Sequence, residues 1–162
     1  KDFREKDAIM KTIITYGTFD LFHAGHVEVL RRARALGDRL IVGCSTDEFN
    51  ASKGKEAIYK YEDRAEIIKA CRFVDAVLPE RNWEQKVTDI KEHGADIFAI
   101  GDDWAGKFDF LTEATGCVVA YLPRTPNIST TDVRDVIKTL ESEKKSSVIQ
   151  SAEHLLALIK NL

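Results

Sequence analysis

Short, continuously apolar runs alternate with segments of helical periodicity along most of the chain. The apolar runs are bounded by polar residues, glycine or proline, and they predict buried strands at residues 11–16, 38–45, 75–79, 96–101 and 117–123. Strands that are apolar on both faces and separated by helices indicate a parallel sheet. The predicted fold class is therefore α/β, a doubly wound, Rossmann-like five-stranded parallel sheet with helices on both faces.

Helical spacing predicts helices at residues 26–36, 62–73, 83–93 and 130–140. Gly37 and Gly94 follow the first and third of these, where glycine is favoured after a helix end. The polar segment 50–62, which contains Gly54 and lysines, is expected to be a loop. The side chains expected to point inward are Val27, Leu30 and Ala33 in the first helix, and Ile67, Ala70 and Cys71 in the second.

The chain is expected to have three parts. Residues 1–9 precede Met10 and are interpreted as an N-terminal extension or an expression remnant, and residues 10–140 form the main domain. Residues 141–162 begin with a charged connector, ESEKKSS, and end in an amphipathic helix that must cover either this domain or a partner. The apolar stripe of that helix consists of Val148, Ala152, Leu155, Ile159 and Leu162.

Composition narrows the class of protein. Of the 162 residues, 44% are hydrophobic and 31% are charged, which is ordinary for one globular domain. The net charge of −3 argues against nucleic-acid binding over a large surface but permits a local basic pocket. The three cysteines are widely spaced, which favours free thiols in a reducing cytoplasm over a disulfide framework. No apolar run approaches the roughly 18 residues of a membrane span, so a cytoplasmic protein without membrane contact is expected.

Polar segments follow the predicted strands, and the topology brings them to one edge of the sheet. The first is GTFDLFHAGH at residues 17–26, and later ones lie at 80–86, 101–107 and 124–131. Basic side chains outnumber acidic ones there, which suggests a small polyanionic ligand. The charged residues are Lys53, Lys55, Arg64, Arg72, Arg81, Lys86, Lys107 and Arg124 against Asp20, Asp102 and Asp103.

His23 and His26 leave three interpretations open. Two histidines three residues apart could bind zinc, but no third ligand or HExxH motif is visible. Either histidine could instead cap a helix or pair with a carboxylate. Phosphate binding is favoured, because imidazole N–H groups are good donors and His26 falls in the first turn of a helix, where anions are attracted.

Other motifs point the same way without deciding the ligand. The segment ISTT at residues 128–131 would supply hydroxyl groups to a second anion site at a helix start. Neither GxGxxG nor GxxxxGK[ST] follows the first strand, which argues against a dinucleotide site and an ordinary ATPase. Trp83 and Trp104 could anchor the surface to the core or stack on a base, and Asp102-Asp103 could form a capped turn or a ligand site.

The pair of motifs His23-Ala24-Gly25-His26 and Ile128-Ser129-Thr130-Thr131 resembles the nucleotidyltransferases that carry HxGH and ISTT. Within them, the stretches TYGTFDLFHAGH, STDEFN, NWEQK, GDDWAGKFDF and YLPRTPNISTT are similar to the glycerol-3-phosphate cytidylyltransferases, and the likeness covers residues 11–140. The resemblance implies a catalytic domain at residues 10–140 that transfers the cytidylyl group of CTP to sn-glycerol 3-phosphate and releases pyrophosphate. It also implies Mg²⁺ bound through the CTP phosphates rather than by protein ligands, a homodimer, and a product used for teichoic-acid-like or capsular polymers.

The resemblance further implies roles for individual residues. His23 and His26 would hold the α- and β-phosphates, Gly25 would let the backbone approach them, and Lys53 would bridge the acceptor and the α-phosphate. The implied catalytic residues are His23, His26, Lys53, Lys55 and Arg124. The implied CTP site comprises Thr18, Phe19, His23, Ala24, Gly25, His26, Lys55, Asp103, Arg124, Thr125, Pro126, Asn127, Ile128, Ser129, Thr130 and Thr131. The implied acceptor site comprises Lys53, Trp83 and Lys86, with Asp20, Arg64 and Arg72 in support.

One segment departs from the family pattern, and alternatives stay open. Pro126-Asn127 stand where the family commonly has Glu-Gly, and proline removes a backbone N–H from the segment. The enzyme alternative is a cytidylyl- or adenylyltransferase of the same superfamily acting on another polyol, amino-alcohol or sugar phosphate, against which NWEQK and GDDWAGKFDF argue. A nucleotide sensor would be expected to lack one of the histidines or lysines, and a scaffold would act through residues 148–162.

Overall fold

The computed structural model describes residues 10–126 and 129–160, the last six by their backbone only. The chain divides into two compact units, Lys1–Asn127 and Ile128–Leu162. The first unit contains the whole sheet, and the second consists of one helix. No helix among the described residues is long and apolar enough to cross a membrane.

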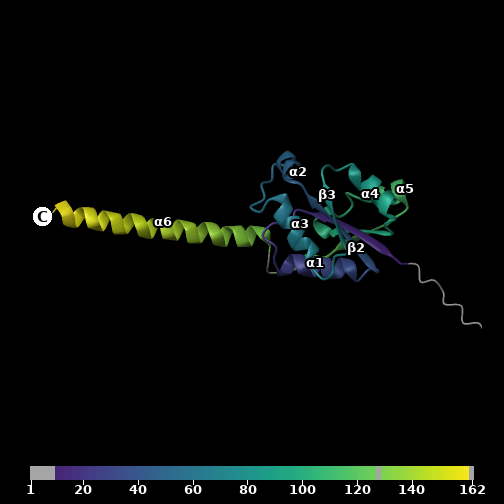
Figure 1. The fold of residues 1–162 in the computed structure, drawn as a ribbon, viewed down its shortest axis with the longest axis horizontal. Helices are drawn as coiled ribbons and strands as arrows, with labels where there is room; N and C mark the ends of the chain where they lie inside the picture. Colours follow the sequence, from purple (N-terminus) through teal and green to yellow (C-terminus); the bar gives the residue numbers. More distant parts are fainter. Residues whose placement is uncertain (1–9, 127–128, 161–162) are drawn as a thin grey trace, which may run out of the picture. The chain divides into compact units, whose positions relative to one another are not determined.

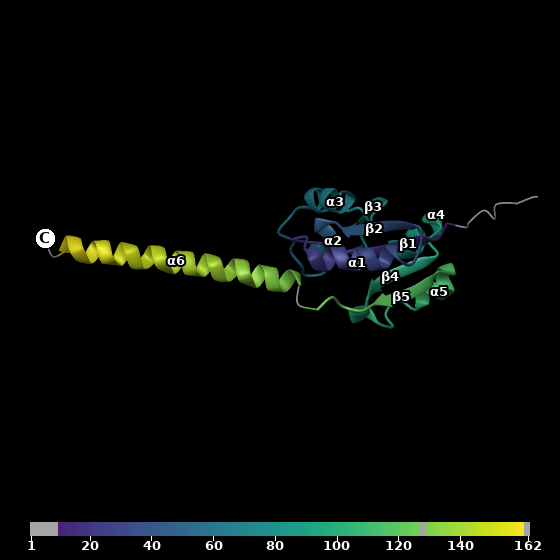
Figure 2. The same ribbon diagram turned by 90° about the horizontal axis from the view of Figure 1, so that it is seen from below.

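The predicted fold class is confirmed. The strands are β1 (Thr12–Gly17), β2 (Arg39–Ser45), β3 (Ala76–Glu80), β4 (Ile97–Gly101) and β5 (Val118–Leu122). They form one sheet of order β3-β2-β1-β4-β5, and every pair is parallel (Figures 1 and 2). The chain runs outward from β1 to β3 and then returns to place β4 on the other side of β1. The carboxyl ends of β1 and β4 thus lie at a topological switch point, where such sheets bind ligands.

Helices cover both faces of the sheet. They are α1 (Ala24–Arg34), α2 (Asp47–Ser52), α3 (Tyr61–Lys69), α4 (Gln85–His93) and α5 (Phe110–Thr115), with a short 3-10 helix at Asp102–Trp104. Side chains of α1 and α3 pack on one face, and side chains of α4 and α5 pack on the other. The two cores contain Ile13, Leu30, Leu40, Val42 and Ile68 on the first face, and Ile14, Ile41, Ile90, Phe98 and Leu111 on the second.

Three local predictions were wrong. Residues 50–52 belong to α2 rather than to a loop, because Thr46 caps this helix through Phe49 N (3.2 Å) and two acidic residues occupy its first turn. In α3 the inward residues include Arg64 and Ile68, whereas Ile67 and Ala70 are exposed. Val27 of α1 is also exposed. Leu30 and Ala33 of α1 are buried as predicted, so Val27 is the only error on that face, whereas in α3 packing buried Arg64, Ala65 and Ile68 instead.

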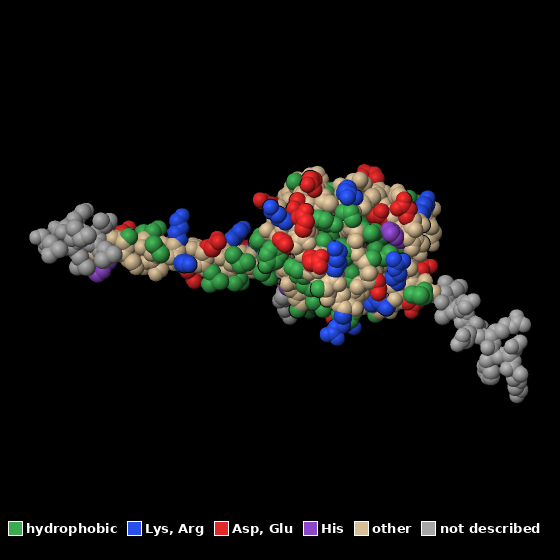
Figure 3. Space-filling view, in the orientation of Figure 1, with side chains coloured by type: hydrophobic (Ala, Val, Ile, Leu, Met, Phe, Trp, Pro, Cys, Tyr) green, Lys and Arg blue, Asp and Glu red, His purple; other side chains and the backbone are tan. Residues whose placement is uncertain are grey.

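The second unit is the 31-residue helix α6 (Thr130–Lys160). The expected connector at 141–147 does not interrupt it, because Glu, Lys and Ser are compatible with a helix interior. Apolar side chains are exposed along α6, which Figure 3 shows in green, and they include Val136, Ile137, Leu140, Val148 and Ile149. Leu155, Ile159 and Leu162 of the predicted stripe lie outside the residues whose side chains are described.

Candidate functional site

The loop after β1 has an unusual backbone at two positions. Phe19 and Leu21 have positive φ angles of 52° and 47°, which cost energy in residues with a side chain. Between them, the buried carboxylate of Asp20 accepts hydrogen bonds from Ile58 N (2.8 Å) and Tyr59 N (2.9 Å). The strained loop is thereby held against the segment that follows α2. Asp20 therefore supports the site by holding the segment after α2 in place.

His23 and His26 cap the helix that they begin. His23 is the N-cap of α1, and its Nδ1 accepts from Gly25 N (3.1 Å). The Nδ1 of His26 accepts from the backbone N of His23 (3.4 Å), which completes a reciprocal capping box. Because both Nδ1 atoms accept, the proton that each ring can donate is on Nε2. The stacked rings, 3.9 Å apart between centroids, thus provide a pair of Nε2–H donors.

The environment of His26 keeps its ring neutral. Burial, followed by the proximity of His23, lowers the pKa of His26 to about 4. The ring contacts Phe19 edge-on (5.4 Å between centroids) and Phe22 (5.5 Å). Phe19 itself is buried, so it positions His26 from the core side. At neutral pH the histidine pair is therefore a pair of fixed hydrogen-bond donors at a helix N-terminus, which is an arrangement suited to phosphate oxygens.

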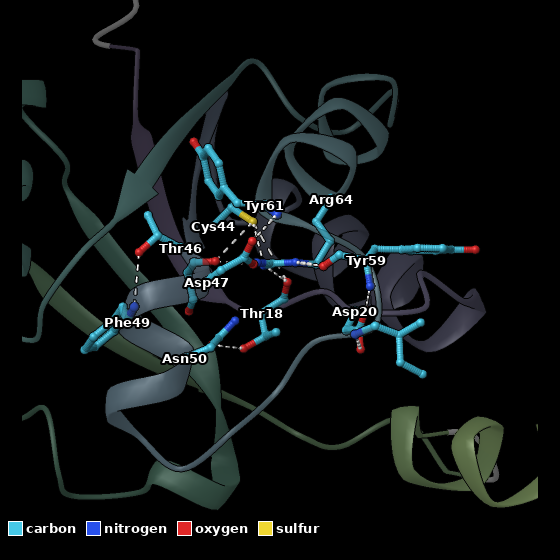
Figure 4. A network of polar contacts seen from close by, with 12 residues as sticks. Thr18, Asp20, Cys44, Thr46, Asp47, Phe49, Asn50, Tyr59, Tyr61 and Arg64 are labelled. Carbon is cyan, nitrogen blue, oxygen red and sulfur yellow. Dashed lines mark hydrogen bonds and ion pairs between the residues drawn. The ribbon is translucent and has the colours of Figure 1, made fainter. Parts of the chain in front are cut away.

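Arg64 is fully buried and ties the strand ends to the segment around α2 (Figure 4). A guanidinium suits this place because its planar group of five N–H donors can reach several acceptors at once. The structure places Arg64 as a support of the site. Its acceptors are the carbonyl oxygens of Thr18 (2.7 Å), Ser45 (2.8 Å) and Tyr59 (2.9 Å) and the carboxylate of Asp47 (2.6 Å).

Two lysines share one carboxylate at the ends of β2 and β3. Glu80 accepts from Lys86 Nζ and from Ser45 Oγ, each at 2.5 Å, and Lys53 Nζ donates to the same Ser45 Oγ (3.1 Å). Ser45 and Glu80 occupy paired positions in the sheet. Burial lowers the pKa of both lysines, and Glu80 opposes that effect. Lys86 is only 1% exposed, so Lys53 is the member of the cluster that a ligand can reach.

Aromatic rings surround these ammonium groups. Lys53 Nζ lies 4.1 Å from the ring centroid of Phe49, and Lys86 Nζ lies 4.5 Å from Tyr16 and 4.7 Å from Trp83. Trp83 also packs against Trp104 (5.5 Å between centroids). The two tryptophans thus belong to one aromatic cluster over the lysines. Such rings stabilise a desolvated cation. Stacking of either tryptophan on a base stays a prediction.

The remaining predicted residues are less closely connected. Lys55, Arg72, Asp103 and Arg124 are exposed, and Thr18 Oγ1 donates to Asn50 Oδ1 (2.9 Å) near Arg64. Ala24 and Pro126 are exposed and Thr125 is partly buried, whereas Asn127 and Ile128 lie outside the described residues. In the second unit, Ser129 caps the start of α6 through Asp132 N (3.2 Å) and precedes Thr130 and Thr131.

Ser45, Asn50 and Glu80 were missed by the sequence analysis. Ser45 and Glu80 are the last residues of adjacent strands, and that shared position is the signal that could have identified them. Asn50 carried no signal beyond its place in the segment STDEFN.

The donor set does not favour a metal held by the protein. Residues 10–126 and 129–154, whose side chains are described, contain no group of three or more His, Cys, Asp or Glu side chains that could bind a metal ion. The Asp20 carboxylate is occupied by two backbone N–H groups.

Comparison with known proteins completes the description of the site. Residues 14–136 match the family model described as cytidylyltransferase-like. The chain is 56% identical over 131 residues to glycerol-3-phosphate cytidylyltransferase of Bacillus subtilis (strain 168), which covers 81% of this chain and 100% of that protein. It is 52% identical over 125 residues to the enzyme of the same name from Staphylococcus aureus (strain NCTC 8325 / PS 47), covering 77% and 93% of the two chains.

A solved structure supports the fold. The lipopolysaccharide core biosynthesis protein from Thermoplasma volcanium GSS1 superposes with a TM-score of 0.61 at 24% identity, over 74% of this chain and 99% of that one. At this identity the likeness extends to the fold alone.

Proposed function

The chain belongs to the cytidylyltransferase-like family, and on that basis we propose that it is a glycerol-3-phosphate cytidylyltransferase. It transfers the cytidylyl group of CTP to sn-glycerol 3-phosphate and yields CDP-glycerol and pyrophosphate. The observation that carries this proposal is the identity of more than half of the aligned residues over the full length of a curated enzyme with that activity in its name. The phosphate-binding chemistry of the site agrees with it.

The proposed reaction is a direct displacement at the α-phosphorus of CTP. An oxygen of the glycerol 3-phosphate group forms the new P–O bond, and the bond from the α-phosphorus to the bridging oxygen of the β-phosphate breaks. The acceptor is already an anion and therefore needs no strong base. Catalysis then consists of alignment and charge stabilisation. The Nε2–H groups of His23 and His26 would donate to the α- and β-phosphates as negative charge moves onto pyrophosphate.

The lysines would reduce the repulsion between two anions. Lys53 is partly exposed and hydrogen-bonded to Ser45, which suits contact with the acceptor phosphate. Lys55 follows it after Gly54 and would serve the nucleotide. Trp83 borders the same cluster and would line the acceptor site. By the family resemblance, Arg124 would also contact CTP.

The proposal extends to cofactor, location and assembly. Mg²⁺ would enter with CTP and neutralise phosphate charge, held by the phosphate oxygens. A homodimer and a cytoplasmic location are proposed from the family resemblance. The three cysteines are unpaired, as is usual in a reducing compartment. The product would be the substrate of an enzyme that transfers glycerol phosphate to a growing teichoic-acid-like or capsular polymer.

A substrate matrix tests this function. Pyrophosphate release is measured with each of the four nucleoside triphosphates against a panel of phosphorylated polyols, amino alcohols and sugars. The highest kcat/KM is expected for CTP with sn-glycerol 3-phosphate, because a pocket that hydrogen-bonds the cytosine edge leaves polar groups unpaired with another base. If ATP matched CTP with glycerol 3-phosphate, the cytidylyl assignment would fall. A higher kcat/KM with another phosphorylated alcohol would reassign the acceptor.

A further inference from the structure

Glu80 is a buried carboxylate that faces two lysines and has no established part in the reaction. It ends β3 and is 2% exposed. One carboxylate oxygen accepts from Lys86 Nζ and the other accepts from Ser45 Oγ, both at 2.5 Å. Ser45 in turn accepts from Lys53 Nζ at 3.1 Å. A single carboxylate thus supports one ammonium directly and a second through a hydroxyl group.

Among the residues that the structure describes, no other carboxylate near these lysines is placed to substitute for Glu80. Around Lys86, Asp89 is occupied by the Tyr16 hydroxyl (2.8 Å) and the Gln85 amide (2.8 Å), and Glu84 is exposed. The nearby aromatic rings attract a cation but carry no net charge. The charged and titratable groups that act on the two lysines are Glu80, Glu84, Asp89, Lys55, Arg64 and the paired lysine itself, and Tyr16 packs against Lys86.

The charge balance of the cluster has a consequence for ligands. Lys53 and Lys86 carry two positive charges against one negative charge on Glu80. The net charge of the cluster is therefore +1, and of its two lysines only Lys53 is accessible to a ligand. Burial lowers the pKa of both lysines, and the carboxylate of Glu80 opposes this loss of the proton. Without the carboxylate, the two ammonium groups would repel one another, and the buried one, that of Lys86, would lose its proton first.

We propose that Glu80 is a positioning residue of the acceptor site, which holds Lys86 directly and Lys53 through Ser45 so that their combined charge binds the phosphate of the acceptor. The inference rests on the proposed function for the identity of that phosphate. The arrangement of the two lysines around Glu80 does not depend on it. Glu80 acts through the lysines and does not touch the substrate.

The central test is Glu80→Gln, which keeps the shape of the side chain and removes its charge. In this variant the KM for glycerol 3-phosphate is expected to rise as the pH is raised above 7, because loss of the carboxylate lowers the pKa of Lys86 further. Loss of a single proton can raise this KM by at most about tenfold per pH unit. In the unsubstituted protein the same KM is expected to stay constant within about twofold. The KM for CTP is expected to change by less than about twofold in both proteins.

Three further variants separate positioning from folding. Glu84→Gln makes the same change on an exposed carboxylate near Lys86 and is expected to leave both KM values unchanged. Ser45→Ala cuts only the link to Lys53 and should raise the acceptor KM without the new pH dependence. Glu80→Gln combined with Lys86→Met removes both charges of the buried pair. This double variant should recover thermal stability but retain a raised, pH-independent acceptor KM.

A measurement without substrate keeps this inference separate from the proposed function. The pKa of each lysine is followed by NMR of ¹³Cε-labelled lysine, assigned with Lys53→Arg and Lys86→Arg. A lower pKa of Lys86 in Glu80→Gln is expected, and an unchanged pKa would overturn the proposal. Equal rises of both KM values, or a rise independent of pH, would also overturn it by showing a purely structural role. Absence of turnover with glycerol 3-phosphate in the unsubstituted protein would instead refute the acceptor assignment.

Discussion

The sequence analysis treated helix capping and phosphate binding by the HxGH histidines as alternatives, but the cap uses only one nitrogen of each ring. In most capping boxes a Ser or Thr at the N-cap and a Glu at the third helical position satisfy the free backbone N–H groups. Here His23 and His26 occupy those two positions and use Nδ1 for the cap. Imidazole has a second nitrogen, which Ser and Glu lack, and that nitrogen carries the donor proton. The helix-cap interpretation is confirmed, and phosphate binding by the same rings stays a prediction.

The first prediction concerns catalysis. His23→Ala and His26→Ala are each expected to lower kcat by about 10²–10³, the usual effect of losing one donor that stabilises developing charge. The stability cost should be only that of a lost cap, about 1 kcal/mol. Steady-state kinetics and urea unfolding measure the two effects. His93→Ala, at the end of α4, is the matched control and should keep kcat. Near-normal kcat with a collapsed melting temperature would make the histidines purely structural.

The second prediction concerns pH and stability. The pKa of His26 is lowered from 6.5 to about 4 in the folded protein, so below pH 6.5 the unfolded chain takes up a proton that the folded chain does not. The stability from the neutral ring is complete above pH 6.5 and declines as the pH falls towards 4. The loss is at most about 3.4 kcal/mol, from about 1.36 kcal/mol for each pH unit between 6.5 and 4. Urea unfolding of the unsubstituted protein and His26→Gln between pH 4 and 7.5 should show a shallower decline in the variant. Parallel curves would refute the assignment.

At the scale of single residues, the sequence analysis found the residues that belong to a recognisable motif. It missed the residues that support them by hydrogen bonds. His23, His26 and Lys53 were identified because of their spacing and charge. Ser45 and Glu80 were missed because their importance lies in the pairing of two strand ends, which becomes visible only once the sheet order is known. The burial of Lys86 was equally unpredictable, since a lysine on a helix is usually exposed.

At the scale of elements, α2, α3 and the segment between them form one supporting structure for the lysines. Asp20 holds this segment by the N–H groups of Ile58 and Tyr59, and Arg64 holds it by the carbonyl of Tyr59. All five strands were predicted within two residues of their observed ends, because buried parallel strands are continuously apolar. The short helices α2 and α5 were not predicted, since six residues show too little periodicity.

The third prediction concerns this supporting structure. Asp20→Ala removes two hydrogen bonds to a carboxylate, each worth about 1.5–3 kcal/mol, and should release residues 53–60. Trypsin cleavage after Lys53, Lys55 or Lys60 is expected to accelerate at least about tenfold, with the sites identified by mass spectrometry. The matched control is Asp38→Ala, whose carboxylate accepts from Lys11 N at the other end of the sheet. The same cleavage rate in both variants would show that Asp20 does not hold the segment.

At the scale of the whole molecule, the sheet order explains why segments distant in the sequence follow strand ends at one edge of the sheet. The loop after β1 carries the histidines, and the neighbouring ends of β2 and β3 carry the lysine cluster. The exposed residue Asp103 follows β4, and Arg124 follows β5. The alternation of strands and helices predicted this parallel architecture and, with it, a ligand site at the carboxyl ends of the strands. The continuous course of α6 was not predicted, because a charged stretch resembles a connector and also tolerates a helix.

The fourth prediction concerns the C-terminal part of α6. A chain ending at Leu140 is expected to retain kcat/KM with CTP and glycerol 3-phosphate within about threefold, or less than about 0.7 kcal/mol. The reason is that 131 residues of this chain already span the whole Bacillus subtilis relative, which leaves 31 of the 162 residues outside the match. The proposed homodimer should also survive, since the resemblance that implies it covers residues 11–140. Light scattering after size exclusion measures the mass of the assembly. The full-length chain with Asp38→Ala, prepared in the same way, is the control for effects of sample preparation. A monomer after truncation would assign the dimer contact to residues 141–162, whose exposed Val148 and Ile149 would then be the first side chains to replace.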